Sequence, residues 1–124
     1  MQSDRYEKGL AMMRRIKGED KPAVLESLQD IAPDFARYIV EFAFGDIYAR
    51  PGLDVKTREI VAVAALTAIK ASHTQLKGHI ASALNAGWTQ EEVLEAIMQV
   101  VIYAGFPAAL NGLLAAKEAF AERA

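Results

Sequence analysis

Cysteine is absent from this chain of 124 residues. Its absence excludes disulfide bonds, thiolate metal sites, thiol nucleophiles and dithiol redox chemistry. The chain has two histidines, His73 and His79. Neither can be paired with a thiol, so any reaction at these rings must use other partners.

An excess of charge of either sign is also missing. The chain has 14 basic and 16 acidic residues, which gives a formal net charge of −2. This balance creates no long-range field that would attract nucleic acid or anionic lipid. We therefore expect neither as a partner.

The chain lacks a long uninterrupted apolar run. Its N-terminal stretch, "MQSDRYEKGLAMMRR", has no apolar signal core. The most apolar stretch, residues 93–117, is interrupted by Glu95, Gln99, Pro107 and Asn111. We interpret it as a buried or interfacial helix pair rather than a membrane span, and we expect a cytoplasmic protein.

No segment shows the alternation of polar and apolar residues that is typical of a β-strand. Signals for helix ends are frequent instead: Gly18 ends a predicted helix over residues 4–17, and Thr89 with Glu92 forms a capping box. We predict an all-α fold, a compact bundle of about six helices in one domain spanning residues 1–124.

Two segments are predicted to supply much of the core. The helix that opens at Pro33 has an apolar stripe formed by Phe35, Tyr38, Ile39 and Phe42. The helix over residues 55–70 is apolar around nearly its whole circumference after Glu59, so we expect it to be central and buried. Tyr48 and Tyr103 are expected to be amphipathic core residues.

The apolar content is high for a chain of this size. Hydrophobic residues make up 52% of the sequence, and a small body has little interior in which to bury them. A subunit interface absorbs such a surplus most simply. We therefore expect an obligate homo-oligomer.

His79 lies in the segment "KASHTQLKGHIASALNAG", at the edge of an apolar helix face that contains Leu76 and Ile80. If the helix extends back far enough, Ser72, Gln75 and His79 lie near one stripe. The alternative is a boundary histidine that bonds a carbonyl across the bundle. His73 is expected at the exposed start of the helix, and we assign it no role.

Glu59 is the second candidate. Ala62 and Val63 continue its stripe at i+3 and i+4, so its carboxylate points along a face that becomes core. A carboxylate that loses water there can act as an acid or a base. Alternatively, it only sits near the start of a helix, where the dipole favours anions, or pairs with Lys56 or Arg58 of another subunit.

Other residue types give weaker signals. Arg50, Arg58 and Lys77 are the basic residues that can bind a carboxylate ligand. The sequence has no His-x-x-x-His or Glu-x-x-His pair and no glycine-rich phosphate loop. We therefore expect neither a metal nor another cofactor.

Three segments carry a resemblance to a known family. They are "LDVKTREIVAVAALTAIKAS", "QLKGHIASALNAGWTQEEVLEAI" and "VIYAGFPAALNGLLAAKE", in order from Leu53 to Glu118. Together they resemble the carboxymuconolactone decarboxylase family, and residues 6–52 look like the extra N-terminal helices of its short members. The resemblance implies the fold of the alkyl hydroperoxide reductase partner (AhpD-like) superfamily and assembly into a homohexamer or trimer.

The family divides chemically. One branch carries Cys-x-x-Cys-x-x-x-His with an upstream Glu, and counting back from His79 places those cysteines at Ser72 and Gln75. Thiol peroxidase chemistry is therefore excluded in this chain. The segment "HIASALN", from His79 to Asn85, is similar to the decarboxylase branch, while Glu59 matches the upstream acid of the thiol branch.

The resemblance implies a cofactor-independent carboxy-lyase that acts on a small unsaturated lactone or oxo acid. Loss of CO2 would leave a carbanion conjugated to the lactone carbonyl. His79 would stabilise the oxygen or reprotonate carbon, with Glu59 orienting it, and Ser72, Gln75 and Arg58 would bind substrate. The alternative is a non-catalytic helical oligomer that binds a small ligand or partner.

Overall fold

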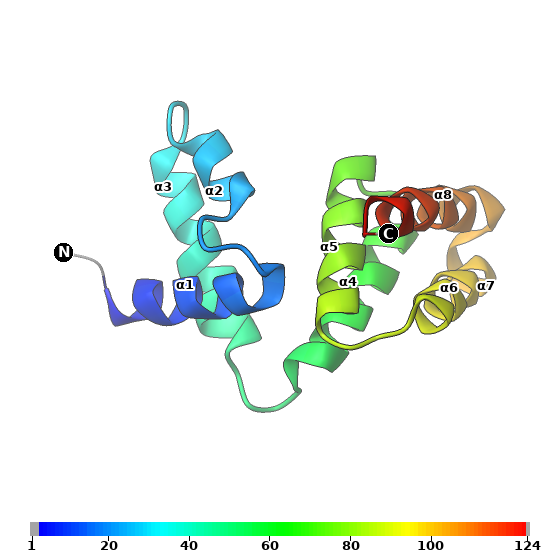
Figure 1. Ribbon diagram of the computed structural model, residues 1–124, viewed down its shortest axis with the longest axis horizontal. Helices are drawn as coiled ribbons and strands as arrows, with labels where there is room; N and C mark the ends of the chain where they lie inside the picture. The colour runs from blue at the N-terminus through cyan, green and yellow to red at the C-terminus, as the bar shows by residue number, and fades with distance from the viewer. Residues whose placement is uncertain (1–2, 124) are drawn as a thin grey trace. The chain divides into compact units, whose positions relative to one another are not determined.

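The computed structural model describes residues 3–123, and every regular element in that range is a helix (Figure 1). The predicted all-α class is confirmed. The described chain forms two compact units, residues 3–55 and residues 56–123. A single family domain over residues 1–124 stays a prediction. Within residues 3–123, no helix is both long and apolar enough to cross a membrane.

Unit 1 contains four helical elements: α1 (Asp4–Lys17), α2 (Ala23–Leu28), α3 (Pro33–Tyr38) and the π-helix η1 (Ile39–Tyr48). The predicted bounds of α1 are confirmed. Its first turn is capped by the Ser3 hydroxyl, which accepts from the Tyr6 N–H at 3.1 Å. Its end is set by Gly18, whose φ of 69° is a left-handed conformation that favours glycine.

The helix that opens at Pro33 changes type after Tyr38. In η1 each backbone N–H bonds to the carbonyl five residues earlier, instead of four residues earlier as in an α-helix. For example, the Ala49 N–H donates to the Phe44 carbonyl at 3.1 Å. Residues four apart therefore stay close to one line. The buried line is Ala36, Val40 and Phe44.

The stripe predicted for this helix is wrong except at Ile39, which is partly buried against the core of unit 1. Phe35, Tyr38 and Phe42 are all more than half exposed, because the face that packs against the other helices of the unit contains Ala36, Val40 and Phe44 instead. Tyr48, by contrast, stacks on Phe44 with 5.0 Å between ring centroids, and its predicted place in the core is confirmed.

Two glycines let α1 pack closely across η1 (Figure 1). A Cβ on Gly9 would lie 2.0 Å from the Val40 carbonyl oxygen, and one on Gly45 would lie 2.6 Å from the Arg5 carbonyl oxygen. Both neighbours are backbone atoms that cannot move aside independently of their helices. The crossing therefore requires glycine at both positions.

Unit 2 contains the remaining helices: α4 (Val55–Ala68, from its second residue on), α5 (His73–Asn85), α6 (Gln90–Gln99), α7 (Val101–Ala104) and α8 (Phe106–Arg123). The last of these packs against the three that precede it (Figure 1). The core of the unit is built from buried apolar residues of α4, α5, α6 and α8: Val63, Leu76, Ile80, Ala83, Val93, Ile97, Ala115, Ala116 and Ala119.

Helix α4 is less buried than its composition predicts. Its fully buried residues are Glu59, Val63 and Thr67, which recur every four residues along one stripe. Val61 and Ile69 are 53% and 73% exposed. The prediction of an all-round buried helix is wrong for the single chain, because only one face of α4 packs against other helices of unit 2.

The predicted starts of α6 and α8 are confirmed. Gly87 follows the end of α5 with φ of 111°, and Thr89 and Glu92 form both hydrogen bonds of a capping box. Pro107 lies in the first turn of α8. The prediction that Tyr103 lies in the core is wrong: it is 81% exposed, because it lies on α7, a four-residue helix that buries none of its residues.

We predict that Gly9→Ala lowers the free energy of unfolding of the chain by about 2 kcal/mol or more, because the new methyl group meets the Val40 backbone. Gly52→Ala is the matched control, since a Cβ there meets nothing within 4 Å. Urea unfolding of both variants measures the difference. Equal stability of the two variants would contradict the close crossing of α1 and η1.

Candidate functional site

The structure brings Glu59 and His79 together. They are 20 residues apart in the sequence and lie on α4 and α5. The His79 Nδ1 atom lies 3.4 Å from the Glu59 Oε2 atom. The Glu59 side chain is fully buried, whereas 19% of the His79 side chain is exposed. The pair thus joins an acid in the interior to a ring that reaches the surface of unit 2.

One oxygen of Glu59 lacks a partner. Its Oε1 atom is buried, and no donor within residues 3–123 forms a hydrogen bond with it. Burial of a carboxylate without full hydrogen bonding is costly, and groups left in this condition are concentrated at functional sites. A proton or a ligand donor would satisfy this oxygen.

The orientation of His79 assigns different tasks to its two ring nitrogens. Nδ1 faces Glu59, so Nε2, across the ring, is the nitrogen left for another group. A ring that donates its Nδ1–H to Glu59 has Nε2 free to accept a proton, and the protonated ring can donate from Nε2. The contact is long for an N–H···O bond, and catalytic contacts often tighten only when substrate binds.

Ser72 and Gln75 lie at the start of α5. The Ser72 hydroxyl accepts from the Gln75 N–H at 3.3 Å and caps the helix, which therefore begins at His73. The helix does not extend back to Ser72, so the single stripe of Ser72, Gln75 and His79 considered from the sequence is not formed. Both residues are exposed, and Arg58 is partly buried next to Glu59 in the chain.

A comparison of sequences places this site in a family. The sequence profile of the carboxymuconolactone decarboxylase family matches residues 33–118. The chain belongs to this family. The match covers α4 and α5, so both members of the Glu59–His79 pair lie within it. It also begins earlier than the resemblance noted from the sequence, which started at Leu53.

Relatives cover most of the chain. A 4-carboxymuconolactone decarboxylase of Acinetobacter baylyi is 36% identical over 94% of this chain and 87% of its own length. An uncharacterized 15.0 kDa protein of Paracoccus denitrificans is 32% identical over 79% of this chain and 74% of its own length. A nitrosuccinic acid decarboxylase of Metarhizium robertsii is 28% identical over 88% of this chain and 76% of its own length.

Unit 1 contains a surface pocket of about 360 Å³ beside Arg37, and neither Glu59 nor His79 lines it. The Arg37 guanidinium is already paired with Asp34 at 3.1 Å and with Glu41 at 3.5 Å.

Within the described residues, no three His, Asp or Glu side chains are grouped as they would be to hold a metal ion.

Sequence reasoning missed the role of His73. The His73 Nε2 atom contacts the Glu118 carboxylate on α8, and Lys77 binds both Glu118 and Glu122. These four residues form a charged cluster that ties α5 to α8. Lys77 is therefore engaged within the chain rather than held for a ligand. The i, i+4 spacing of His73 with Lys77 and of Glu118 with Glu122 was the available sequence signal.

Sequence reasoning also did not single out Trp88. It is the only tryptophan of the chain, and its indole N–H donates to the Lys56 carbonyl of α4 at 2.6 Å. Its position between the glycine that ends α5 and the capping box of α6 was the signal that could have identified it.

We predict that Glu118→Gln destabilises the protein at neutral pH and that the difference from wild type disappears in acid. Hydrogen bonds from His73 and then Lys77 lower the pKa of Glu118 below its ordinary value of 4.5. A lowered pKa means that the carboxylate stabilises the fold above that value and that this contribution is lost as the pH falls below it.

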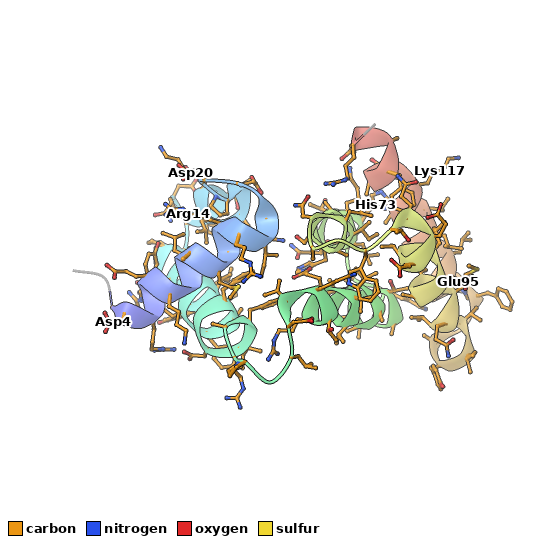
Figure 2. All side chains as sticks on the ribbon, turned by 60° about the horizontal axis from the view of Figure 1, so that its bottom comes forward. Asp4, Arg14, Asp20, His73, Glu95 and Lys117 are labelled. Atoms are coloured by element: carbon orange, nitrogen blue, oxygen red, sulfur yellow. The ribbon has the colours of Figure 1, made fainter. Side chains whose placement is uncertain are left out.

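Urea unfolding at neutral pH and at about pH 3 measures this effect. Glu95→Gln, on α6 and away from the cluster (Figure 2), controls for the loss of one negative charge. A destabilisation by Glu118→Gln that is the same at both pH values would contradict the prediction.

Proposed function

We propose that the protein is a decarboxylase that acts on a small carboxylate-bearing unsaturated lactone or oxo acid without a cofactor. The observation that carries the proposal is the fully buried Glu59, which has one unpartnered oxygen and lies beside the partly exposed His79. Relatives that are named as decarboxylases and cover most of the chain support it.

The compounds in the relatives' names share one chemical property. Carboxymuconolactone carries a carboxylate on the γ-carbon, next to the C=C bond that is conjugated to the lactone carbonyl, and nitrosuccinic acid carries one on the carbon that bears a nitro group. When CO2 leaves either compound, the electron pair of the broken bond moves onto oxygen. The substrate itself accepts the electrons, so the protein has to stabilise the resulting anion and supply a proton to carbon.

His79 performs these two tasks in the proposed mechanism. The bond between the substrate carbon and its carboxylate breaks, CO2 leaves, and the electron pair forms a dienolate. Protonated His79 donates from Nε2, first as a hydrogen bond to the developing anion and then as a proton to carbon. The neutral ring regains a proton from water. Glu59 holds the Nδ1–H throughout and fixes the orientation of the ring.

We assign substrate binding to residues that lie near this pair in the sequence. Arg58 precedes Glu59 on α4, and its guanidinium suits a carboxylate. Ser72 and Gln75 lie at the start of the helix that carries His79. We propose that the exposed Ser72 and Gln75 contact the polar atoms of the lactone and that the partly buried Arg58 contacts its carboxylate.

Exposed apolar residues support assembly into a homo-oligomer, a trimer or a hexamer. They recur at every fourth position from α6 through α7 to α8, and each is at least 44% exposed: Met98, Ile102, Phe106, Leu110 and Leu114. Together with Val61 and Ile69 of α4, they give unit 2 exposed apolar side chains of the kind that a subunit interface buries.

The purified protein is expected to convert carboxymuconolactone, with loss of lactone absorbance and release of CO2. His79→Gln should lower kcat by roughly 10²- to 10⁴-fold, because it removes the proton donor. His73→Gln, on the same helix but paired with Glu118, is the matched control and should retain activity. Full turnover by a folded His79→Gln protein would refute the mechanism, and no turnover by wild type would remove this substrate.

Phe106→Glu is expected to shift the protein to smaller assemblies, because it places a charge among the exposed apolar side chains of α8. Ala121→Glu adds the same charge at another exposed position of α8 and should leave the assembly unchanged. Light scattering coupled to gel filtration measures the mass. A wild-type protein that is monomeric at micromolar concentration would contradict the proposed oligomer.

A further inference from the structure

Hydrogen bonds in the segments directly before and after Trp88 fix its position in the chain. Its own N–H donates to the Ala83 carbonyl at 3.1 Å, and the Gly87 N–H donates to the Leu84 carbonyl at 3.1 Å. This pair of bonds is the Schellman motif that ends α5. Thr89 directly after it begins the capping box of α6. Trp88 therefore has a set position relative to both helices.

From that position Trp88 contacts the first turn of α4 twice. Its indole N–H donates to the Lys56 carbonyl oxygen at 2.6 Å, and the Lys56 ammonium lies 4.5 Å from the centre of its ring. The Lys56 side chain also runs along Gly87, with its Cε 3.8 Å from where a Cβ would be. A hydrogen bond and a cation–π contact thus join one side chain to one residue of α4.

Lys56 lies three residues before Glu59. Residues at this spacing are neighbours on one side of a helix, so the turn held by Trp88 is the turn that positions the Glu59 carboxylate. Helix α4 needs such a tie, because it packs against unit 2 through a single stripe and the backbone groups of a first helical turn fray readily.

We propose that Trp88 is a positioning residue that sets α4 against α5, so that Glu59 stays within reach of His79. Trp88 ends the helix that carries His79 and holds the helix that carries Glu59. The two side chains meet at 3.4 Å, near the limit for a hydrogen bond. A displacement of α4 by a fraction of an ångström is therefore enough to break the contact. The catalytic consequence rests on the proposed function, whereas the positioning does not.

Trp88→Phe tests this proposal, because it keeps an aromatic ring over Lys56 but removes the indole N–H. The readout is the tautomer balance of His79, obtained from ring ¹⁵N chemical shifts at mildly alkaline pH and assigned with a His73→Gln variant. Glu59 favours the Nδ1–H tautomer, so Trp88→Phe should shift the balance toward the Nε2–H form. It should also lower kcat by roughly ten- to a hundredfold with a smaller change in KM.

Phe120→Leu is the control, since Phe120 packs against the same core from α8. It should lower stability and leave the His79 tautomer balance unchanged. Gly87→Ala is the second test variant if Trp88→Phe fails to fold. A side chain is strained at φ of 111°, so this neutral change should displace Trp88 and shift the tautomer balance in the same direction.

An unchanged tautomer balance in folded Trp88→Phe, or in Gly87→Ala when Trp88→Phe does not fold, overturns the proposal. So does a shift of equal size in Phe120→Leu. If wild-type protein shows no decarboxylase turnover, the proposed function fails, but the tautomer measurement still decides whether Trp88 positions Glu59.

Discussion

A carboxylate in the interior is the constraint on which unit 2 depends. Glu59 has no exposed surface, and only one of its two carboxylate oxygens has a hydrogen-bond partner, the ring of His79. A fold gains no stability from such a group compared with an apolar residue of the same size. Its presence makes sense if the rest of the unit is arranged to keep an acid dry and next to an imidazole. The packing of α4 and α5 serves that purpose.

The arrangement around the pair is defined by helix ends more than by long contacts between helix faces. Ser72 fixes the start of α5 and Gly87 fixes its end, so the axial position of His79 is determined from both sides. Trp88, which follows Gly87 directly, then fixes α4 relative to α5 through its hydrogen bond to the Lys56 carbonyl. Helix caps each contribute little energy, about 1 kcal/mol, but here they determine where chemical groups lie.

The sequence predicted features that depend on local chemistry. The cap at Gly18, the capping box at Thr89 and the glycine stop at Gly87 follow from backbone conformation and nearby hydrogen bonds, which a few residues specify. The incorrect predictions concern which face of a helix is buried. Phe35 and Phe42 were expected on the buried face, but Val40 and Phe44 of the π-helix are buried instead.

In the candidate site, too, some features were predictable from the sequence and others depend on how the helices pack. Glu59 and His79 were identified by residue type, position on an apolar face and resemblance, whereas their contact depends on how α4 and α5 pack. Ser72 looked like part of a stripe and is a cap. The link from Trp88 to Lys56 spans 32 residues and has no periodic signal.

The π-helix of unit 1 has a consequence for how this chain tolerates changes in its length. Each turn of η1 takes up more residues than an α-helical turn, so the line of side chains against α1 depends on the number of residues as well as on their identity. Removing one residue of η1 before Phe44 would rotate everything beyond the deletion about the helix axis and turn Phe44 away from the core that it forms with Met13 and Ile16 of α1. Evolution along this segment is therefore expected to proceed by exchange of side chains, while gaps in an alignment of relatives should fall in the connections on either side.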